Sequence, residues 1–250
     1  MKSEKLKIEK YNRRDPSINI VELHQSIFKE TEFEDNLIYF DPNFGSYLKR
    51  LFDCPDHYFY VIKNEGFIEG FIHVRFISDF LILNNIAVSN AYANQGLGKK
   101  LLMFALNDLL RYYTADTVFK LDVFKSNNLA MNWYKRLGFE YEVKTKWFEL
   151  MNLPPLDNQI AKITERRDEN NFLSLYCENE KIATIINGNL VLHRSNMINK
   201  VDLTNYKKII TNNVGFEDVL STDQLKNSTQ LIDISVRMRT GVLSLIQKLF

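Results

Sequence analysis

A short glycine-containing segment is the first place in the sequence where the residue types suggest chemistry. It reads Asn94-Gln95-Gly96-Leu97-Gly98-Lys99 and follows the apolar stretch Ile86-Ala87-Val88. Glycines let a backbone approach phosphate oxygens closely, and free backbone N–H groups at the start of a helix attract anions. Lys99 adds a positive charge. The segment is therefore a candidate phosphate-binding loop, although glycines required only for a tight turn would give the same pattern.

A second segment combines amide and phenol side chains at helical spacing. It contains Asn127, Ala130, Tyr134 and the pair Gly138-Phe139. An amide side chain both donates and accepts hydrogen bonds, and a phenol can give a proton to a leaving group. Structural roles fit the same residues, because Tyr134 can pack in a helical stripe and Asn127 can cap the start of a helix.

Taken together, the two segments resemble the fingerprint of the GNAT superfamily of N-acetyltransferases, over roughly residues 1 to 150. The glycine segment matches the loop motif Gln/Arg-x-x-Gly-x-Gly/Ala except at its first position, which is Ala93. The second segment matches the later part of the fingerprint. The resemblance implies acetyl-coenzyme A as co-substrate. It also implies weaker coenzyme binding, unless Asn94, Gln95 or Lys99 compensates for Ala93.

The resemblance further implies roles for individual residues. Ile86 to Val88 are expected to present a strand edge to the amide-rich arm of the coenzyme, and their backbone amides to polarise the thioester carbonyl. Asn127 is expected to hydrogen-bond the same arm, and Tyr134 to protonate the departing thiolate. The expected cofactor-binding set is Ile86, Ala87, Val88, Asn94, Gln95, Gly96, Leu97, Gly98, Lys99, Asn127 and Tyr134.

An attacking amine must also lose a proton, because a free alkylamine has a pKa near ~10. Asp122 is the preferred base, since alternation within Val118–Phe124 puts it opposite the buried face of its strand. Some members of the family carry an acidic residue at this position. Asp79 and His73 are alternatives, and a purely structural Asp122 fits equally well. The predicted catalytic residues are therefore Tyr134 and Asp122.

Hydrophobic periodicity predicts the elements that must position these residues. Strands are expected over His57–Ile62, Phe67–Ile77, Phe80–Val88 and Val118–Phe124, with a bulge at Asn84-Asn85. Helices are expected near Ile20–Phe28 and Phe44–Phe52, from the glycine loop to Tyr113, and from Ser126-Asn127 to Leu137, where Gly138 ends the last of them. The alternation of strands and helices predicts an α/β fold with a mixed sheet.

The remainder of the chain is expected to form a second domain. Leu153-Pro154-Pro155-Leu156 predicts the boundary, because paired prolines interrupt regular pairing. Strands are expected at Phe172–Tyr176, Lys181–Ile186, Leu190–His193 and Leu231–Val236, and a helix at Val242–Phe250. The sequence thus predicts a GNAT-like catalytic domain over residues 1–153 and a smaller, strand-rich α+β domain over residues 156–250. The second domain is expected to shape an acceptor pocket or to form a homodimer surface.

Composition limits the partners. The chain has 45% hydrophobic and 25% charged residues and a net charge of +1, without the basic excess typical of nucleic-acid-binding proteins. Cys54 and Cys177 show neither a disulfide framework nor a metal-binding spacing, so no metal is expected. The polar N-terminal stretch does not resemble a signal peptide, and no apolar run approaches the ~18 residues of a membrane span. The expected location is the cytoplasm.

The sequence therefore predicts an N-acetyltransferase that acetylates the primary amine of a small molecule, such as an amino sugar, an amino acid or a polyamine. Transfer to a protein or peptide amine is the first alternative. The second is a non-catalytic sensor that binds acetyl-coenzyme A, which the presence of Ala93 favours.

Overall fold

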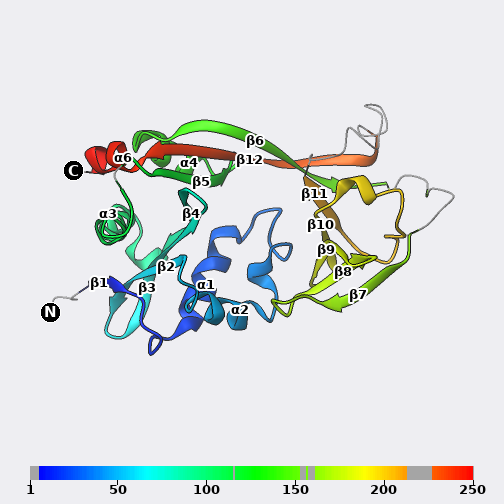
Figure 1. The fold of residues 1–250 in the computed structure, drawn as a ribbon, viewed down its shortest axis with the longest axis horizontal. Helices are drawn as coiled ribbons and strands as arrows, with labels where there is room; N and C mark the ends of the chain where they lie inside the picture. The colour runs from blue at the N-terminus through cyan, green and yellow to red at the C-terminus, as the bar shows by residue number, and fades with distance from the viewer. Residues whose placement is uncertain (1–5, 115, 153–155, 157–160, 213–226, 250) are drawn as a thin grey trace. The chain divides into compact units, whose positions relative to one another are not determined.

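The computed structural model describes residues 6–114, 116–152, 156, 161–212 and 227–249, and Figure 1 traces them along the chain. The chain forms two compact units. The first unit comprises Met1–Ile27, Gly45–Val143 and Val236–Phe250, and the second comprises Phe28–Phe44 and Lys144–Ser235. No helix in the described part of the chain is both long and apolar enough to cross a membrane.

A mixed β-sheet forms the centre of the first unit. Its strands follow the order β1-β2-β3-β4-β5-β12, with β6 beyond β12. The strands β1 to β4 are antiparallel neighbours, whereas β4 and β5 run parallel. The bounds are Lys7–Lys10 (β1), His57–Asn64 (β2), Phe67–Ile77 (β3), Phe80–Val88 (β4), Val118–Phe124 (β5), Glu140–Leu150 (β6) and Thr229–Gly241 (β12). The mixed α/β sheet expected from the sequence is confirmed.

The strand β4 contains the irregularity that its two asparagines predict. His73 of β3 lies opposite Asn85, but the next residue, Val74, lies opposite Leu83, so Asn84 is an extra residue in β4. The parallel pairing of β4 with β5 begins at Phe80 and ends at Leu83, immediately before this bulge. Beyond Leu83, β4 continues its pairing with β3 alone.

Helices cover both faces of this sheet. Phe59 of β2 packs against Phe52, which follows helix α2 (Phe44–Leu51), whereas the neighbouring Tyr60 contacts Phe104 of helix α3 (Leu97–Leu109). Successive residues of a strand point to opposite faces, so α2 and α3 lie on opposite sides. Helix α1 (Ser17–Phe28) lies on the α2 side, because the ring of its His24 contacts Phe71 of β3 at 4.3 Å. Phe71 shares a face of β3 with His73, and His73 stacks on Phe59. The helix α3 ends at Leu109, four residues before the predicted Tyr113, in tight turns.

Helix α4 (Asn128–Arg136) joins β5 to β6 and begins and ends as predicted. The Asn127 side chain accepts a hydrogen bond from the Ala130 N–H at 3.0 Å, and Gly138 adopts a left-handed φ of 85° just after the helix. Such an asparagine cap and glycine terminator satisfy backbone groups that the helix itself leaves unpaired.

The second unit is a small sheet of mostly antiparallel strands. Its order is β6-β11-β10-β9-β8-β7. The bounds are Ile163–Arg167 (β7), Leu173–Cys177 (β8), Glu180–Ile186 (β9), Asn189–Leu192 (β10) and Ile209–Asn212 (β11). Asn187 and Gly188, both with positive φ, form the predicted hairpin turn between β9 and β10. Strands β7 and β11 were not expected, because one is mostly charged and the other is very short.

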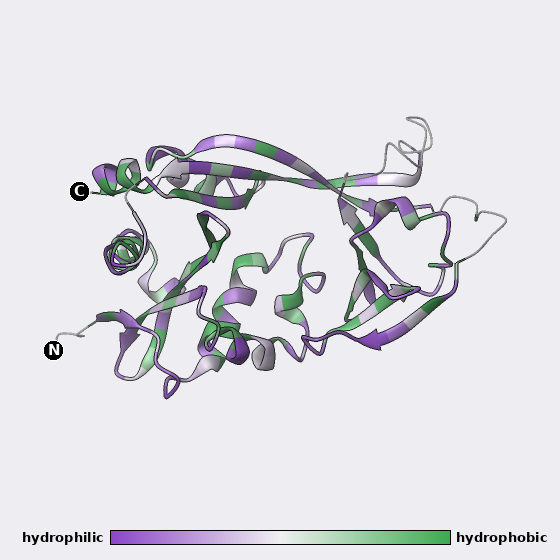
Figure 2. Ribbon diagram, in the orientation of Figure 1, coloured by the Kyte–Doolittle hydropathy of each residue, from purple (hydrophilic) through white to green (hydrophobic). Residues whose placement is uncertain are grey.

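The compact units do not follow the predicted division of the chain. Pro154-Pro155 lies outside the described residues, and the last segment, Val236–Phe250, belongs to the first unit. Strand β12 lies next to β5, and helix α6 (Val242–Leu249) follows it, with the Val242 N–H donating to the Thr117 carbonyl at 3.0 Å. The sequence pattern of a C-terminal segment does not indicate which distant strand it will pair with. Figure 2 shows that β6 is mainly hydrophilic, with isolated hydrophobic bands between the hydrophilic residues.

Candidate functional site

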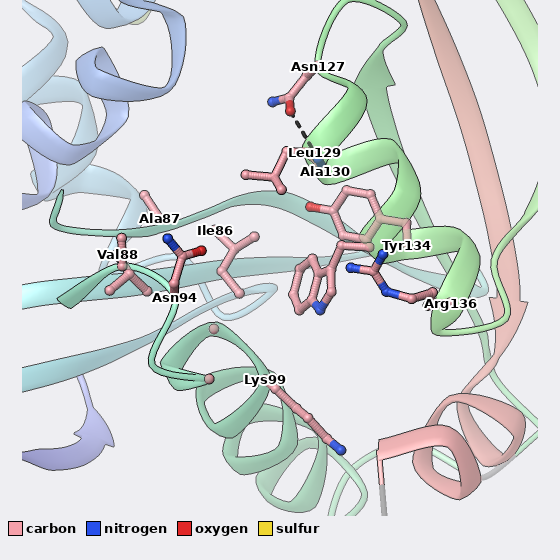
Figure 3. A pocket seen from close by; sticks show the side chains of 14 residues that line it. Ile86, Ala87, Val88, Asn94, Lys99, Asn127, Leu129, Ala130, Tyr134 and Arg136 are labelled. Carbon is pink, nitrogen blue, oxygen red and sulfur yellow. Dashed lines mark hydrogen bonds between the residues drawn. The ribbon is translucent and has the colours of Figure 1, made fainter.

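A cavity of about 460 Å³ lies in the first unit, between the end of β4, the loop before α3, and α4 (Figure 3). Nine of the eleven residues in the predicted cofactor-binding set line it. They are Ile86, Ala87, Val88, Asn94, Gly96, Gly98, Lys99, Asn127 and Tyr134. The structure therefore brings two segments that are separated in the sequence to one site.

The wall formed by β4 is a strand edge that no described strand pairs with beyond Leu83 on the β5 side. Pairing with β5 ends at Leu83, and Ile86 to Val88 line the cavity beyond that point. Backbone N–H and C=O groups on such an edge are available to an extended ligand, which can pair with them as an added strand would. The bulge at Asn84 is thus the feature that opens the site.

The loop before α3 is shaped for an anion. Asn94 and Gly96 adopt left-handed φ values of 60° and 72°, and α3 begins directly after Gly96. Alternating conformations of this kind turn backbone N–H groups toward one point, and the first turn of a helix adds N–H groups with no partner inside the helix. A Cβ at Gly98 would meet only the Trp133 ring, at 4.0 Å, so Gly98 leaves this part of the cavity open.

The opposite wall is helix α4, which carries Tyr134. The side chain is 7% exposed, and Figure 3 shows its hydroxyl directed into the cavity, toward the β4 wall. Burial raises the pKa of the Tyr134 phenol above its ordinary value near 10, so the hydroxyl keeps its proton at neutral pH. Asn127 also lines this wall, with its carbonyl oxygen engaged in the helix cap.

Two predicted residues do not line the cavity, and residues that were not predicted do line it. Leu97 is 6% exposed and buries its side chain in the core, and the Gln95 amide donates to the Ala91 carbonyl at 3.4 Å, so neither lines the cavity. Trp133 and Arg136 line it without having been predicted. Trp133 lies three positions after Ala130, and Arg136 three after Trp133, so each neighbours the preceding one on the helix surface, a signal in the sequence that was not used.

The structure does not bring Asp122 to this cavity. It lies on the exposed side of β5, where the Arg237 guanidinium donates to both carboxylate oxygens at 2.9 and 2.6 Å. Asp79 lies in the turn before β4, at the end of that strand away from Ile86.

His73 is also outside the cavity lining but lies against the bulge. It is 4% exposed, and its Nε2 is 2.8 Å from Nδ1 of His57 and 3.3 Å from the Asn84 amide nitrogen. Burial, together with the neighbouring His57, His24 and Arg75, lowers the pKa of His73 well below its usual value near 6.5. His73 is therefore neutral at physiological pH.

These features define a class of protein. A glycine loop that opens a helix, a strand edge that no described strand pairs with and a buried tyrosine hydroxyl line one cavity beside a mixed sheet, an arrangement that suits a coenzyme-dependent α/β acyltransferase. Residues 19–139 match the sequence profile described as Acetyltransferase (GNAT) family. The chain carries a GNAT acetyltransferase domain, and it is an acyltransferase that uses acetyl-coenzyme A.

Solved structures support the same fold. A candidate acetyltransferase from Pyrococcus horikoshii is 18% identical with a TM-score of 0.60, and the match covers 94% of this chain and 89% of that one. A GCN5-related N-acetyltransferase from Sphaerobacter thermophilus is 9% identical with a TM-score of 0.56, over 95% of this chain and 96% of that one. No curated protein sequence matches the chain.

Proposed function

We propose that this enzyme transfers the acetyl group of acetyl-coenzyme A to the primary amine of a small molecule, such as an amino sugar, an amino acid or a polyamine. One observation carries the proposal: the unpaired edge of β4 from Ile86 to Val88 and the Tyr134 hydroxyl line the same cavity. The strand edge supplies pairing groups for the coenzyme arm, and Tyr134 supplies a proton where the thiolate would leave.

The coenzyme has a natural position in this cavity. Its pantetheine arm contains two amides, which can exchange hydrogen bonds with the free backbone groups of β4. Its pyrophosphate then reaches the loop that contains Gly96 and Gly98 and the first turn of α3. Ala93 also lines the cavity. Its methyl group cannot bind an anion, so the backbone amides of the loop serve as the anion-binding groups there.

The chemistry follows from this placement. The amine nitrogen attacks the thioester carbonyl carbon, and a new C–N bond forms as the C–S bond breaks. Backbone N–H groups of β4 stabilise the negative charge on the carbonyl oxygen during the attack. Tyr134 gives its proton to the sulfur, and the amine loses one proton to a base.

Of the three candidate bases from the sequence, Asp122, Asp79 and His73, we favour His73, because Asp79 lies at the end of β4 away from Ile86 and Asp122 lies outside the cavity lining. The Arg237 guanidinium donates hydrogen bonds to both oxygens of Asp122, so the carboxylate is already engaged on the exposed side of β5. His73 is neutral at physiological pH, lies beside the bulge, and shares a hydrogen bond between its Nε2 and Nδ1 of the half-buried His57. We therefore propose that His73 accepts the proton and that Asp122 stabilises the pairing of β5 with β12.

The role of Tyr134 is tested by the substitution Tyr134→Phe. We expect kcat to fall by about 10² to 10³, the range of a lost general acid, while KM for acetyl-coenzyme A changes little. Release of the coenzyme thiol measures turnover. Tyr112→Phe is the matched control, because Tyr112 is 61% exposed and outside the cavity. Full turnover by Tyr134→Phe at saturating acetyl-coenzyme A would remove Tyr134 from the mechanism.

A second pair of variants separates the two bases. We expect Asp122→Asn to change kcat by less than about twofold and to cost at most about 1 kcal/mol of stability, as for a surface ion pair. We expect His73→Gln to lower kcat by about 10² at pH 7 and less at high pH, where the free amine is abundant. The pH profile of kcat/KM, with melting temperatures for both variants, distinguishes the outcomes. A large loss of kcat in Asp122→Asn, with little loss in His73→Gln, would restore Asp122 as the base.

The acceptor class is decided by a panel. Glucosamine, amino acids and spermidine represent small amines, and short peptides with free N-termini or lysines represent protein acceptors. Acetylation of the peptides alone would make the chain a protein acetyltransferase. If no amine is acetylated and acetyl-coenzyme A still raises the melting temperature, the chain binds the coenzyme as a sensor.

A further inference from the structure

Arg136 is a cation in the cavity whose charge nothing in the described part of the chain neutralises. It lies in the last turn of α4 and lines the cavity, and Figure 3 shows its guanidinium extending over the cavity beside Tyr134. Arg237 of the same unit, by contrast, is paired with Asp122 at 2.6 Å. Arg136 makes no ion pair, hydrogen bond or ring contact with another described residue. An unpaired guanidinium beside a coenzyme cavity is available to an anionic ligand.

Trp133 forms a flat surface between Arg136 and the phosphate loop. Its ring reaches the open space beside Gly98, at 4.0 Å from the position of a Cβ there, and lies 5.1 Å from the Tyr134 ring. The side chain is half-buried and lines the cavity. An indole presented in this way offers a planar aromatic base a stacking partner.

The cavity therefore holds two separate positive regions. The first is the cluster of backbone N–H groups at Asn94–Gly96 and the start of α3, together with Lys99. The second is Arg136, on the α4 wall. Coenzyme A likewise carries two separate phosphorylated groups, a pyrophosphate and a 3′-phosphate on the ribose. The 3′-phosphate is a monoester with a charge of about −1.5 to −2 at pH 7, and a guanidinium can bind it through two parallel hydrogen bonds.

We infer that Arg136 binds the 3′-phosphate of coenzyme A while Trp133 stacks on the adenine, so that the enzyme discriminates against acyl carriers that lack this phosphate. The inference rests on the proposed function only in that acetyl-coenzyme A occupies this cavity. Arg136 is thus a specificity-determining residue for the coenzyme and takes no part in the chemistry of acetyl transfer.

A structural role for Arg136 can be separated from this one within the same helix turn. Positive side chains at a helix C-terminus stabilise the helix through its dipole, and the last turn of α4 contains both Lys135 and Arg136. Lys135 is outside the cavity lining, with its Nζ 5.1 Å from the centre of the Tyr141 ring. Lys135→Ala therefore removes the same charge from the same turn without touching the cavity, and it is the matched control for Arg136→Ala.

The experiment measures the dissociation constants of coenzyme A and 3′-dephospho-coenzyme A by calorimetry, for the full chain and its variants. The wild-type protein is expected to bind coenzyme A at least about tenfold more tightly, as for a charge-assisted hydrogen bond. Arg136→Ala is expected to lose this preference, because it should weaken the binding of coenzyme A but not that of 3′-dephospho-coenzyme A. Arg136→Lys should keep part of it, because a lysine preserves the charge but not the paired geometry. Lys135→Ala should keep all of it.

Kinetics add an independent readout. In Arg136→Ala, KM for acetyl-coenzyme A is expected to rise about tenfold while kcat stays within about twofold. Equal weakening of both ligands by Arg136→Ala, or a wild-type protein that binds both ligands equally, would overturn the inference. A wild-type protein that binds neither ligand would overturn the proposed function itself, which is a distinct result.

Discussion

Backbone conformation decides how single residues serve the site. Gly96 has a φ of 72°, a conformation that costs other residues about 1 to 2 kcal/mol, whereas Gly98 has an ordinary helical conformation and open space around it. The two glycines look alike in the sequence, but they meet different requirements. Gly96 shapes the turn, and Gly98 leaves room for the ligand.

Alanine at each glycine separates the two requirements. Gly96→Ala is expected to lower the free energy of unfolding by about 1 kcal/mol, because alanine is strained at positive φ. Gly98→Ala is expected to leave it unchanged or to raise it by up to about 1 kcal/mol, because alanine favours a helix. The affinity of Gly98→Ala for acetyl-coenzyme A should nevertheless fall at least about tenfold. Denaturant unfolding and calorimetry measure the two effects, and unchanged affinity in Gly98→Ala would show that the phosphates bind elsewhere.

At the scale of elements, a bulge and a helix cap assemble the cavity. The extra residue Asn84 marks the point where β4 leaves β5, and the unpaired edge starts there. On the facing wall, the Asn127 cap fixes where α4 begins. With this start, Ala130 and Tyr134 lie on the side of the helix that faces the cavity. The Asn127 oxygen accepts the cap hydrogen bond, and its amide nitrogen is a donor that the cap does not use.

Two substitutions of Asn127 distinguish the cap from coenzyme binding. Asn127→Ala should cost about 1 kcal/mol of stability, as for a lost helix cap, and should also weaken coenzyme binding. Asn127→Asp keeps an oxygen that can cap the helix but has no N–H donor, and its charge is unfavourable near phosphate groups. We therefore expect Asn127→Asp to unfold like the wild-type protein but to bind acetyl-coenzyme A at least about tenfold more weakly. Wild-type binding by this variant would limit Asn127 to the cap.

At the scale of the whole molecule, the first unit depends on the end of the chain. Strand β12 neighbours β5, and Val236, Met238 and Leu245 are at most 2% exposed. The expected catalytic domain of residues 1–153 would leave this segment out. The edge of β5 and part of the apolar core would then face water.

A fragment of residues 1–153 is therefore expected not to fold into a coenzyme-binding protein. We expect aggregation or a non-cooperative thermal transition, followed by circular dichroism. Two substitutions in the full chain give a matched comparison on α6. Leu245→Ala removes a fully buried side chain and should cost about 2 to 5 kcal/mol, whereas Leu243→Ala, at a site 49% exposed, should cost less than about 0.5 kcal/mol. A folded, coenzyme-binding fragment would restore the division predicted from the sequence.

Prediction from the sequence was most successful where the signal is local. The bounds of β3, β4 and β5 follow from runs of apolar and β-branched residues, and the two ends of α4 follow from Asn127 and Gly138. The glycine loop and Tyr134 likewise belong to short motifs. Ala130, Trp133 and Arg136 follow one another in steps of three residues along α4 and all line the cavity, so helical spacing carried a signal that the motif did not use.

The sequence by itself determined most elements of the first unit and predicted the glycine loop and Tyr134 as site residues, because each depends on residues close together in the chain. The tertiary structure decided what those residues face. It paired Asp122 with Arg237, more than a hundred positions away, put β12 beside β5, and left Arg136 at the cavity without an ion pair to any described residue. Such contacts join residues whose separation in the sequence is unrelated to their separation in space, and no periodicity reports them.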